Sequence, residues 1–216
     1  MTMVTNQQLL DAGLDDWRKL AQGLHARFEA PTFVSGAVFV GAIGRVAGEL
    51  DHAPEVRMTS SWVEVKLTTE EDGWWVTDRD VELARRISQI ARDEGLSAQP
   101  RAVMQVEVGL DTADHEVLAP FWAALLTGGL DNVFHGDVMD PDCRVPNVWF
   151  QDTEPHDVPR QRFHLDVWLP QDVAEERIAA AVAAGGRIVD DSQAPSFVVL
   201  ADPDGNKACV CTCLGR

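Results

Sequence analysis

The sequence predicts an α+β protein of two domains: an antiparallel four-stranded sheet with three helices on one face, followed by paired βαβββ modules. Three observations predict this class. The chain has 216 residues, which is long for one compact core and suits two domains of about 100 residues each. Helical periodicity alternates with short strand-like runs in the first half. A pattern of strand, helix and three strands occurs twice in the second half.

Composition narrows the class further. Hydrophobic residues make up 45% of the chain, and no apolar run approaches the roughly 20 residues needed to span a bilayer, so we expect a soluble protein without a membrane segment. The net charge of −17 would repel a phosphate backbone, which argues against nucleic acid as a direct ligand. The N-terminus lacks a basic stretch followed by an apolar core, so we expect a cytoplasmic protein.

The cysteine pattern agrees with a reducing compartment. Cys143 stands alone, and Cys209, Cys211 and Cys213 alternate along one expected strand, where they are too close and too in-line to bridge one another easily. We therefore expect reduced thiols.

The first half begins with helical and extended segments. Residues 7–22 are expected to form a helix with one apolar face. Its apolar positions are Leu9, Leu10, Leu14, Trp17 and Leu20. Short extended pieces are expected at residues 24–28 and 30–33. Residues 34–50 are apolar on much of the circumference of a second helix, which predicts that this helix is buried.

The rest of the first half is expected to be strand residues, a turn and a third helix, which gives the order helix, two strands, helix, two strands, helix. Polar and apolar residues alternate within residues 56–69, as in a half-buried strand. A turn follows at residues 70–75, and Thr77 with Asp80 three residues later predicts an N-terminal capping box. Residues 83–91 have helical spacing. Gly95 and Pro100 then end that helix and open a linker, so we place the domains at residues 1–98 and 99–216.

Three blocks in the first half carry a family resemblance. "GELDHAPEV" ends the second helix, "KLTT" ends the strand, and "TDRD" opens the third helix. The matching positions are Leu50, His52, Pro54 and Glu55, then Leu67, Thr68 and Thr69, then Thr77, Arg79 and Asp80. In register, these blocks resemble the pterin-4a-carbinolamine dehydratase family over most of residues 7–95.

The resemblance implies a hydro-lyase that removes water from a 4a-hydroxytetrahydropterin. An acid that protonates the leaving hydroxyl and a base that deprotonates the ring nitrogen would each contribute about 10²- to 10⁴-fold. His52 and Glu70 are the implied catalytic residues; Ala53 replaces a second family histidine, and Glu70 replaces a third. The residues implied to surround the substrate are Asp51, Ala53, Thr68, Thr69, Glu71 and Asp80. No cofactor is implied.

Two interpretations of this site stay open. His52 either transfers protons or, as a histidine at a helix end, bonds the terminal carbonyls. Trp74 and Trp75 could stack on a flat pterin, but we favour packing. The alternative to an enzyme is a non-catalytic protein that binds a pterin or an aromatic ligand. The dehydratase resemblance also implies a homo-oligomer, with a dimer as the simplest form.

The second half repeats itself. "MQVEVGLDTADHEVLAPFWAALL" aligns with "RFHLDVWLPQDVAEERIAAAVAAGG", with His164 opposite Gln105 and Leu169 opposite Leu110. "DPDGN" predicts a tight turn at residues 202–206 before the last strand. Together with the "FWAALL" run, these features resemble the glyoxalase-like branch of the vicinal oxygen chelate family over residues 103–213.

That resemblance implies a pocket in the second domain at Gln105, Gln151, His164 and Cys209. A catalytic zinc site usually has three protein ligands such as histidine and carboxylate, and neutral glutamine amides bind metal weakly. The four positions therefore predict no metal site. The only partner expected besides a second copy of the chain is a small pterin-like substrate.

Overall fold

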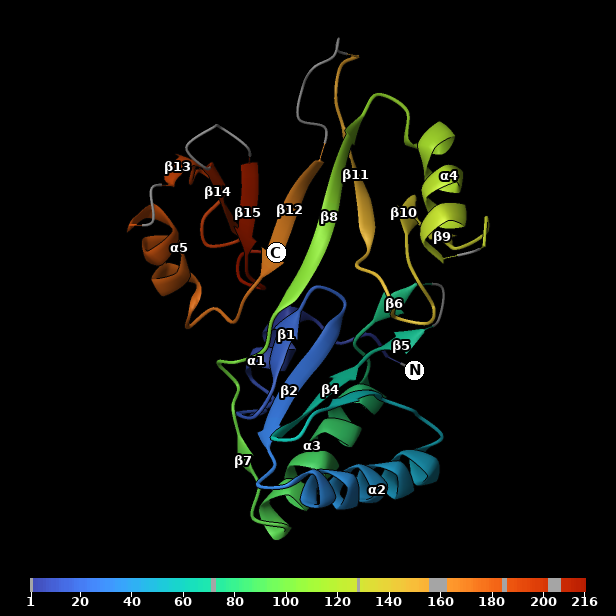
Figure 1. Ribbon diagram of the computed structural model, residues 1–216, viewed down its shortest axis with the longest axis vertical. Coiled ribbons are helices and arrows are strands. Elements are labelled where there is room, and N and C mark those ends of the chain that lie inside the picture. The colour runs from blue at the N-terminus through green and yellow to red at the C-terminus, as the bar shows by residue number, and fades with distance from the viewer. Residues whose placement is uncertain (1, 71–72, 128, 156–162, 184–185, 202–206) are drawn as a thin grey trace. The chain divides into compact units, whose positions relative to one another are not determined.

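The computed structural model describes residues 2–70, 73–127, 129–155, 163–183, 186–201 and 207–216. The chain forms two compact units (Figure 1): Met1–Met104 with Arg216, and Gln105–Gly215. Residues 99–104 of the expected linker thus group with the first unit. Helices, an antiparallel sheet in the first unit and a mixed sheet in the second confirm the α+β class.

The first unit contains an antiparallel sheet and three helices. Its elements are α1 (Asn6–Leu10), β1 (Arg18–Leu20), β2 (Gly23–Glu29), α2 (Phe33–Leu50), β3 (Glu55–Met58), β4 (Trp62–Leu67), β5 (Thr69–Glu70), β6 (Trp74–Trp75), α3 (Asp78–Asp93) and β7 (Ser97–Ala98). The sheet order is β1-β2-β4-β3, all pairs being antiparallel, and the two-residue β7 adds to β2. The expected four-stranded sheet is therefore present, with one short strand from the linker beside it.

Alternation along β4 determines which face of this sheet is covered. Val63, Val65 and Leu67 are fully buried, whereas the residues between them are half-buried. The buried side chains join one core with Leu9 of α1, Phe39 of α2 and residues of α3. Because one face of β4 meets all three helices in the same core, the prediction of helices on one face is confirmed.

The expected helix over residues 7–22 is wrong beyond its first turns. α1 ends at Leu10, Gly13 takes a φ of +67°, and β1 follows at Arg18. A left-handed glycine ends a helix at little steric cost. Trp17 and Leu20 still reach the core, but from a turn and a strand, and the Trp17 indole donates to the Ser88 hydroxyl at 3.0 Å. The apolar spacing therefore predicted the burial of Leu9, Trp17 and Leu20 correctly, but Leu10 is 46% exposed and the predicted helix is wrong.

The second expected helix is confirmed as α2, but its burial is one-sided. Thr32 caps its N-terminus by accepting the Ser35 N–H, so Phe33 is helical and the expected extended piece at residues 30–33 is wrong. Phe33, Val34 and Val38 are 57%, 71% and 58% exposed. By length and composition alone α2 could span a membrane, a test that apolar helices of non-membrane proteins also pass. The exposed side corrects the expectation of a helix buried over most of its circumference.

The second unit contains the expected repeat. Its elements are β8 (Gln105–Thr112), α4 (His115–Thr127), β9 (Val133–Phe134), β10 (Asp137–Val138), β11 (Val148–Asp152), β12 (Phe163–Trp168), α5 (Ala174–Ala183), β13 (Arg187–Asp190), β14 (Phe197–Ala201) and β15 (Lys207–Cys211). They form one eight-stranded sheet in the order β13-β14-β15-β12-β8-β11-β10-β9 (Figure 1). Two βαβββ modules thus share a sheet, with β8 and β12 adjacent and antiparallel. The paired-module prediction is confirmed.

The two faces of this sheet differ in chemistry. On one face, apolar strand residues pack against Ala119 and Ala123 of α4 in the first module and against Ala174 and Ile178 of α5 in the second. The other face is largely polar. All four cysteines lie in the described ranges and none forms a disulfide, as expected. The expected turn at residues 202–206 lies outside the described residues.

Candidate functional site

The end of α2 places His52. Asp51 follows the helix with a φ of 48°, and the His52 N–H donates to the Ala47 carbonyl at 3.0 Å. The Arg79 guanidinium donates to the carbonyls of Leu50 and Asp51. Because arginine serves the last carbonyls of the helix, the imidazole of His52 is not needed there. The helix-end interpretation of His52 therefore loses its main support.

The imidazole of His52 instead meets a buried carboxylate. Its Nε2 lies 2.7 Å from Asp80 Oδ1, and the two side chains are 9% and 0% exposed. The other oxygen of Asp80, Oδ2, accepts the Thr69 hydroxyl at 2.8 Å, the Thr77 backbone N–H at 2.8 Å and the Thr77 hydroxyl at 3.1 Å. These donors satisfy a carboxylate that would otherwise be costly to bury.

The same network assigns the tautomer of His52. Asp80 accepts hydrogen bonds on both oxygens, so Nε2 carries the proton that faces Oδ1. Within the described residues, Nδ1 of His52 forms no hydrogen bond with the protein. The imidazole is therefore held by one nitrogen and presents the other, which is the arrangement that a proton-transfer group requires.

Two residues expected to touch substrate are in fact buried. Thr69 is 5% exposed and its hydroxyl bonds Asp80, which is fully buried and in turn bonds His52. Thr68 is half-buried, and its hydroxyl donates to the Gln22 and Trp75 carbonyls. Direct contact of Thr69 and Asp80 with substrate stays a prediction.

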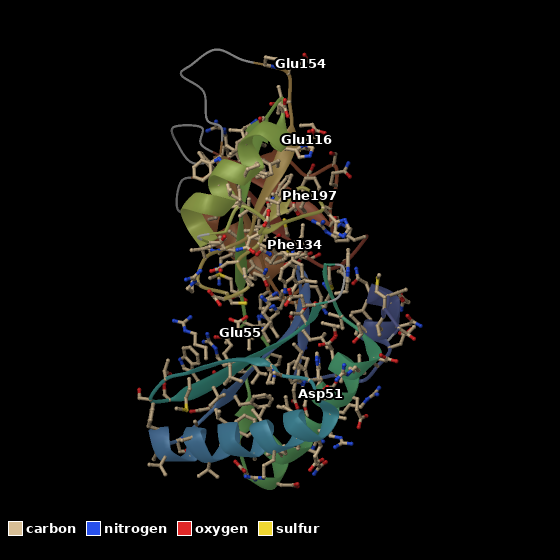
Figure 2. All side chains as sticks on the ribbon, turned by 90° about the vertical axis from the view of Figure 1, so that its right-hand side faces the viewer. Asp51, Glu55, Glu116, Phe134, Glu154 and Phe197 are labelled. Carbon is tan, nitrogen blue, oxygen red and sulfur yellow. The ribbon has the colours of Figure 1, made fainter. Side chains whose placement is uncertain are left out.

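The remaining expected residues lie at the surface. Asp51, at the C-terminal end of α2 (Figure 2), is exposed, as are Ala53 and Glu70. Glu70 pairs with Trp74 in a separate two-stranded sheet of β5 and β6, and the carboxylate that bonds His52 is Asp80 rather than Glu70. Glu71 lies outside the described residues.

Thr77 is the member of this network that the site prediction missed. It was assigned only to the capping box, which is present, because Asp80 accepts the Thr77 backbone N–H. The spacing of the capping box could have indicated that Thr77 bonds Asp80. A buried carboxylate in such a box can also accept a hydrogen bond from a residue outside the helix.

Polar side chains from four neighbouring strands share the second unit's polar face. Residues opposite one another in register lie on the same face. The register sets His164 opposite Gly109, Asp166 opposite Glu107, and Asp166 beside Cys209. Glu107 and Asp166 are both buried, although they carry like charges on adjacent strands. Burial raises the pKa of Asp166, with the Glu107 charge adding to the shift and His164 opposing it.

The four expected pocket positions do not converge as predicted. His164 and Cys209 lie together, but Gln105 is opposite Trp168, and Gln151 is opposite Asp111. The register places Asn147, not Gln151, at the position equivalent to Cys209, because the Val108 N–H donates to the Asn147 carbonyl one residue before Val148 pairs with Val108.

Two buried carboxylates were missed in this unit. Glu107 accepts the Trp168 indole at 2.8 Å and the Asn147 amide at 3.3 Å. Asp166 lies with His164 and Cys209 in a group whose candidate ligand atoms are all within 4.8 Å of one another. The alignment of the two repeats could have indicated these carboxylates. When His164 is aligned with Gln105, Asp166 is aligned with Glu107.

A buried histidine–aspartate pair in a helix-covered antiparallel sheet, joined to paired βαβββ modules, defines a two-domain protein with a dehydratase-type N-terminal unit. Comparison with known proteins agrees. Residues 2–90 match the family "Pterin 4 alpha carbinolamine dehydratase", and residues 107–211 match a "Glyoxalase-like domain". The chain therefore belongs to the pterin-4a-carbinolamine dehydratase family and carries a glyoxalase-like domain in addition.

Similar proteins cover the N-terminal unit. Several are described as "Putative pterin-4-alpha-carbinolamine dehydratase", and two of these serve as examples. The one from Halobacterium salinarum is 35% identical over 72 residues, which are 33% of this chain and 78% of the relative. The one from Natronomonas pharaonis is 36% identical over 77 residues, 35% of this chain and 80% of the relative. A solved "transcriptional coactivator/pterin dehydratase" from Brucella melitensis is 28% identical, with a TM-score of 0.40, covering 42% of this chain and 99% of that one.

Proposed function

We propose that the N-terminal unit dehydrates a 4a-hydroxytetrahydropterin to the quinonoid dihydropterin, with His52 as the proton-transfer residue. The observation that carries this proposal is the 2.7 Å bond between His52 Nε2 and the buried Asp80 carboxylate at the family's histidine position. The relatives' descriptions and the family match over residues 2–90 support the substrate class.

A single imidazole can serve both halves of this reaction in sequence. Protonated His52 donates from Nδ1 to the 4a-hydroxyl, the C4a–O bond breaks, and water leaves. The N5 lone pair forms the C4a=N5 double bond, and N5 then carries a positive charge. Neutral Nδ1 takes the N5 proton, which yields the quinonoid product and restores the protonated imidazole. Protons balance, and no external oxidant or reductant enters.

Asp80 is the positioning residue in this proposal. Its Oδ1 holds the proton of His52 on Nε2, so Nδ1 remains the nitrogen that exchanges protons. Thr69 and Thr77 hold the carboxylate in turn. Glu70 is exposed, and the carboxylate bonded to His52 is that of Asp80. We therefore give Glu70 at most a secondary role.

The test is a dehydration assay on the full chain. Enzymatically generated carbinolamine is added, and the absorbance of the dihydropterin product is followed. We expect acceleration that His52→Ala reduces on the order of 10²-fold, with Glu70→Gln close to the parent. His115→Ala, the same change on α4, is the matched control and should leave the rate unchanged. Pterin binding without acceleration by the parent protein would favour the alternative, a non-catalytic binder.

We also propose that the chain works in the cytoplasm as a homodimer or larger assembly. Four cysteines without a disulfide support a reducing compartment. The exposed Phe33, Val34 and Val38 of α2 support association with a second copy, since monomers rarely expose clustered large apolar residues. Sedimentation equilibrium of the parent and of Val38→Glu measures this: an equal monomer mass for both would reject the assembly.

A further inference from the structure

We propose that the second βαβββ module holds one divalent metal ion with zinc-like preferences, ligated by His164 Nε2, the Asp166 carboxylate and Cys209 Sγ. The candidate ligand atoms of the three side chains lie within 4.8 Å of one another, on the adjacent strands β12 and β15. Nitrogen, oxygen and sulfur donors together suit zinc, and three protein ligands leave a fourth position for water or substrate. The site is separate from the proposed dehydratase chemistry.

The distance between His164 and Asp166 fits shared ligation better than a hydrogen bond. Nε2 and Oδ1 are 3.6 Å apart, beyond the usual N–H···O range. Two donors each about 2.0–2.2 Å from a tetrahedral zinc are about 3.4 Å from one another. An ion between them would thus need little movement of either side chain. Both side chains keep an accessible edge, being 15% and 10% exposed.

The surroundings orient the imidazole for this role. Asp111 Oδ1 lies 3.4 Å from His164 Nδ1, which directs Nε2 toward Asp166. Metal-bound histidines usually contact a carboxylate or carbonyl through the second nitrogen. The Trp149 ring packs edge-to-face against the imidazole of His164, with 4.9 Å between the ring centroids. Gly109 makes room for it, because a Cβ there would lie 2.3 Å from Cε1 of His164.

Charge favours a cation at the same place. Asp166 is buried opposite Glu107, and the two carboxylates repel one another in a low-dielectric setting. Glu107 is bonded by the Trp168 indole and the Asn147 amide, and Asp166 by the side chains of Trp149 and Cys209. Because Cys209 is itself a proposed ligand, an ion between the two side chains would replace this hydrogen bond. A divalent ion would offset the repulsion between the two carboxylates.

The first module supplies an internal comparison. The positions equivalent to His164, Asp166 and Cys209 are Gln105, Glu107 and Asn147. Two neutral amides replace the imidazole and the thiol, and one of them already donates to the carboxylate. Since amides are weak metal ligands, the repeat predicts one ion per chain rather than two.

Cobalt(II) titration of the metal-free full chain tests the proposal, because a thiolate ligand gives Co²⁺ an intense near-ultraviolet charge-transfer band. We expect one Co²⁺ per chain, the band, and its loss when Zn²⁺ is added in competition. Cys209→Ser should abolish the band, and His164→Gln, which copies Gln105, should weaken binding at least tenfold. Cys143→Ser, at an exposed cysteine elsewhere in the unit, is the matched control and should retain the band.

Gly109→Ala is a second variant that removes no ligand. Its methyl group should displace the His164 ring and weaken Co²⁺ binding while the fold, checked by circular dichroism, is kept. No uptake by the parent protein, a band that survives Cys209→Ser, or a stoichiometry of two would each overturn the proposal. Such results would leave the dehydratase assay untouched, so the two proposals fail independently.

Discussion

In the described residues, His52 and His164 each lie beside a buried aspartate, but at different distances. His52 and Asp80 are 2.7 Å apart, whereas His164 and Asp166 are 3.6 Å apart. Asp80 is surrounded by hydroxyl and backbone donors, but Asp166 faces the carboxylate of Glu107. His52 and Asp80 form a direct hydrogen bond that fixes the tautomer of the imidazole. His164 and Asp166 are farther apart and lie near a second carboxylate, an arrangement that suits a bound cation.

The largest effect is expected from Asp80→Asn. An asparagine can accept from or donate to the imidazole, so His52 is no longer confined to one tautomer. We expect kcat/KM for dehydration to fall on the order of 10²-fold. The pH profile of kcat/KM and the ¹⁵N shifts of His52, which report the protonated nitrogen, measure the change.

A buried carboxylate outside the site controls for destabilisation. Asp140 is fully buried and bonded to Arg144, so Asp140→Asn disturbs the interior without touching His52. If Asp140→Asn lowers kcat/KM as much as Asp80→Asn does, or if the Asp80 variant keeps the parent tautomer and rate, the positioning role is wrong.

The next largest effect is expected from a substitution that tests how His164 is oriented. Asp111→Asn should weaken Co²⁺ binding about 10- to 100-fold, because the carboxylate that orients His164 is lost while all three ligands remain. Isothermal titration with Co²⁺ measures the affinity. Asp152→Asn changes a carboxylate 3.9 Å from His115 and should leave the affinity unchanged. Equal affinities for the parent and Asp111→Asn would show that the imidazole needs no such orientation.

The two sites also differ in how far the sequence could predict them. His52 and Asp80 lie in motifs of fixed local spacing, so both were named from the sequence. Their mutual contact was missed, because it joins residues 28 apart in the chain, whereas the family resemblance implied Glu70 as the partner of His52. Burial of Asp80 depends on the packing of α3, which local spacing does not reveal.

In the second unit the repeat predicted the architecture but not the cluster. The two βαβββ modules followed from the internal alignment, and they are confirmed. The meeting of Asp166 with Cys209 depends on the parallel register of β12 and β15, which a single sequence does not determine. The failed helix over residues 7–22 has a similar cause, since burial alone cannot distinguish a helix from a turn and a strand.

A smaller effect is expected from removing a hydrogen-bond donor to Asp80, the carboxylate that bonds His52. Thr69→Val removes the buried hydroxyl that donates to Asp80 and leaves the carboxylate short of one partner. We expect the free energy of unfolding to drop by about 1–2 kcal/mol in urea titrations. Thr68→Val, at the half-buried neighbour, should cost less. If Thr68→Val lowers the free energy of unfolding more than Thr69→Val does, the hydroxyl of Thr69 is not the more stabilising of the two.

The smallest effect extends the comparison to Asp137, which lies near Glu107. Burial, with the Glu107 charge, raises the pKa of Asp137 to about 6, while His115 and His135 lower it. Between about pH 4 and pH 6 the folded chain therefore holds a proton that the unfolded chain has lost, so stability falls as pH rises through this window. Because the residue is partly exposed, solvent screening limits the effect to about 1 kcal/mol.

Asp137→Asn should remove this slope, as measured by urea unfolding at several pH values. Asp140, three residues away, should affect the pH dependence of stability in the opposite direction. The hydrogen bond from Arg144 holds the pKa of the Asp140 carboxyl below its usual range. Its contribution is present above the unfolded pKa and is lost as pH falls, so Asp140→Asn should destabilise the chain most at neutral pH. If both variants shift the profile in the same direction, the charges near Glu107 do not control the stability of this unit as proposed.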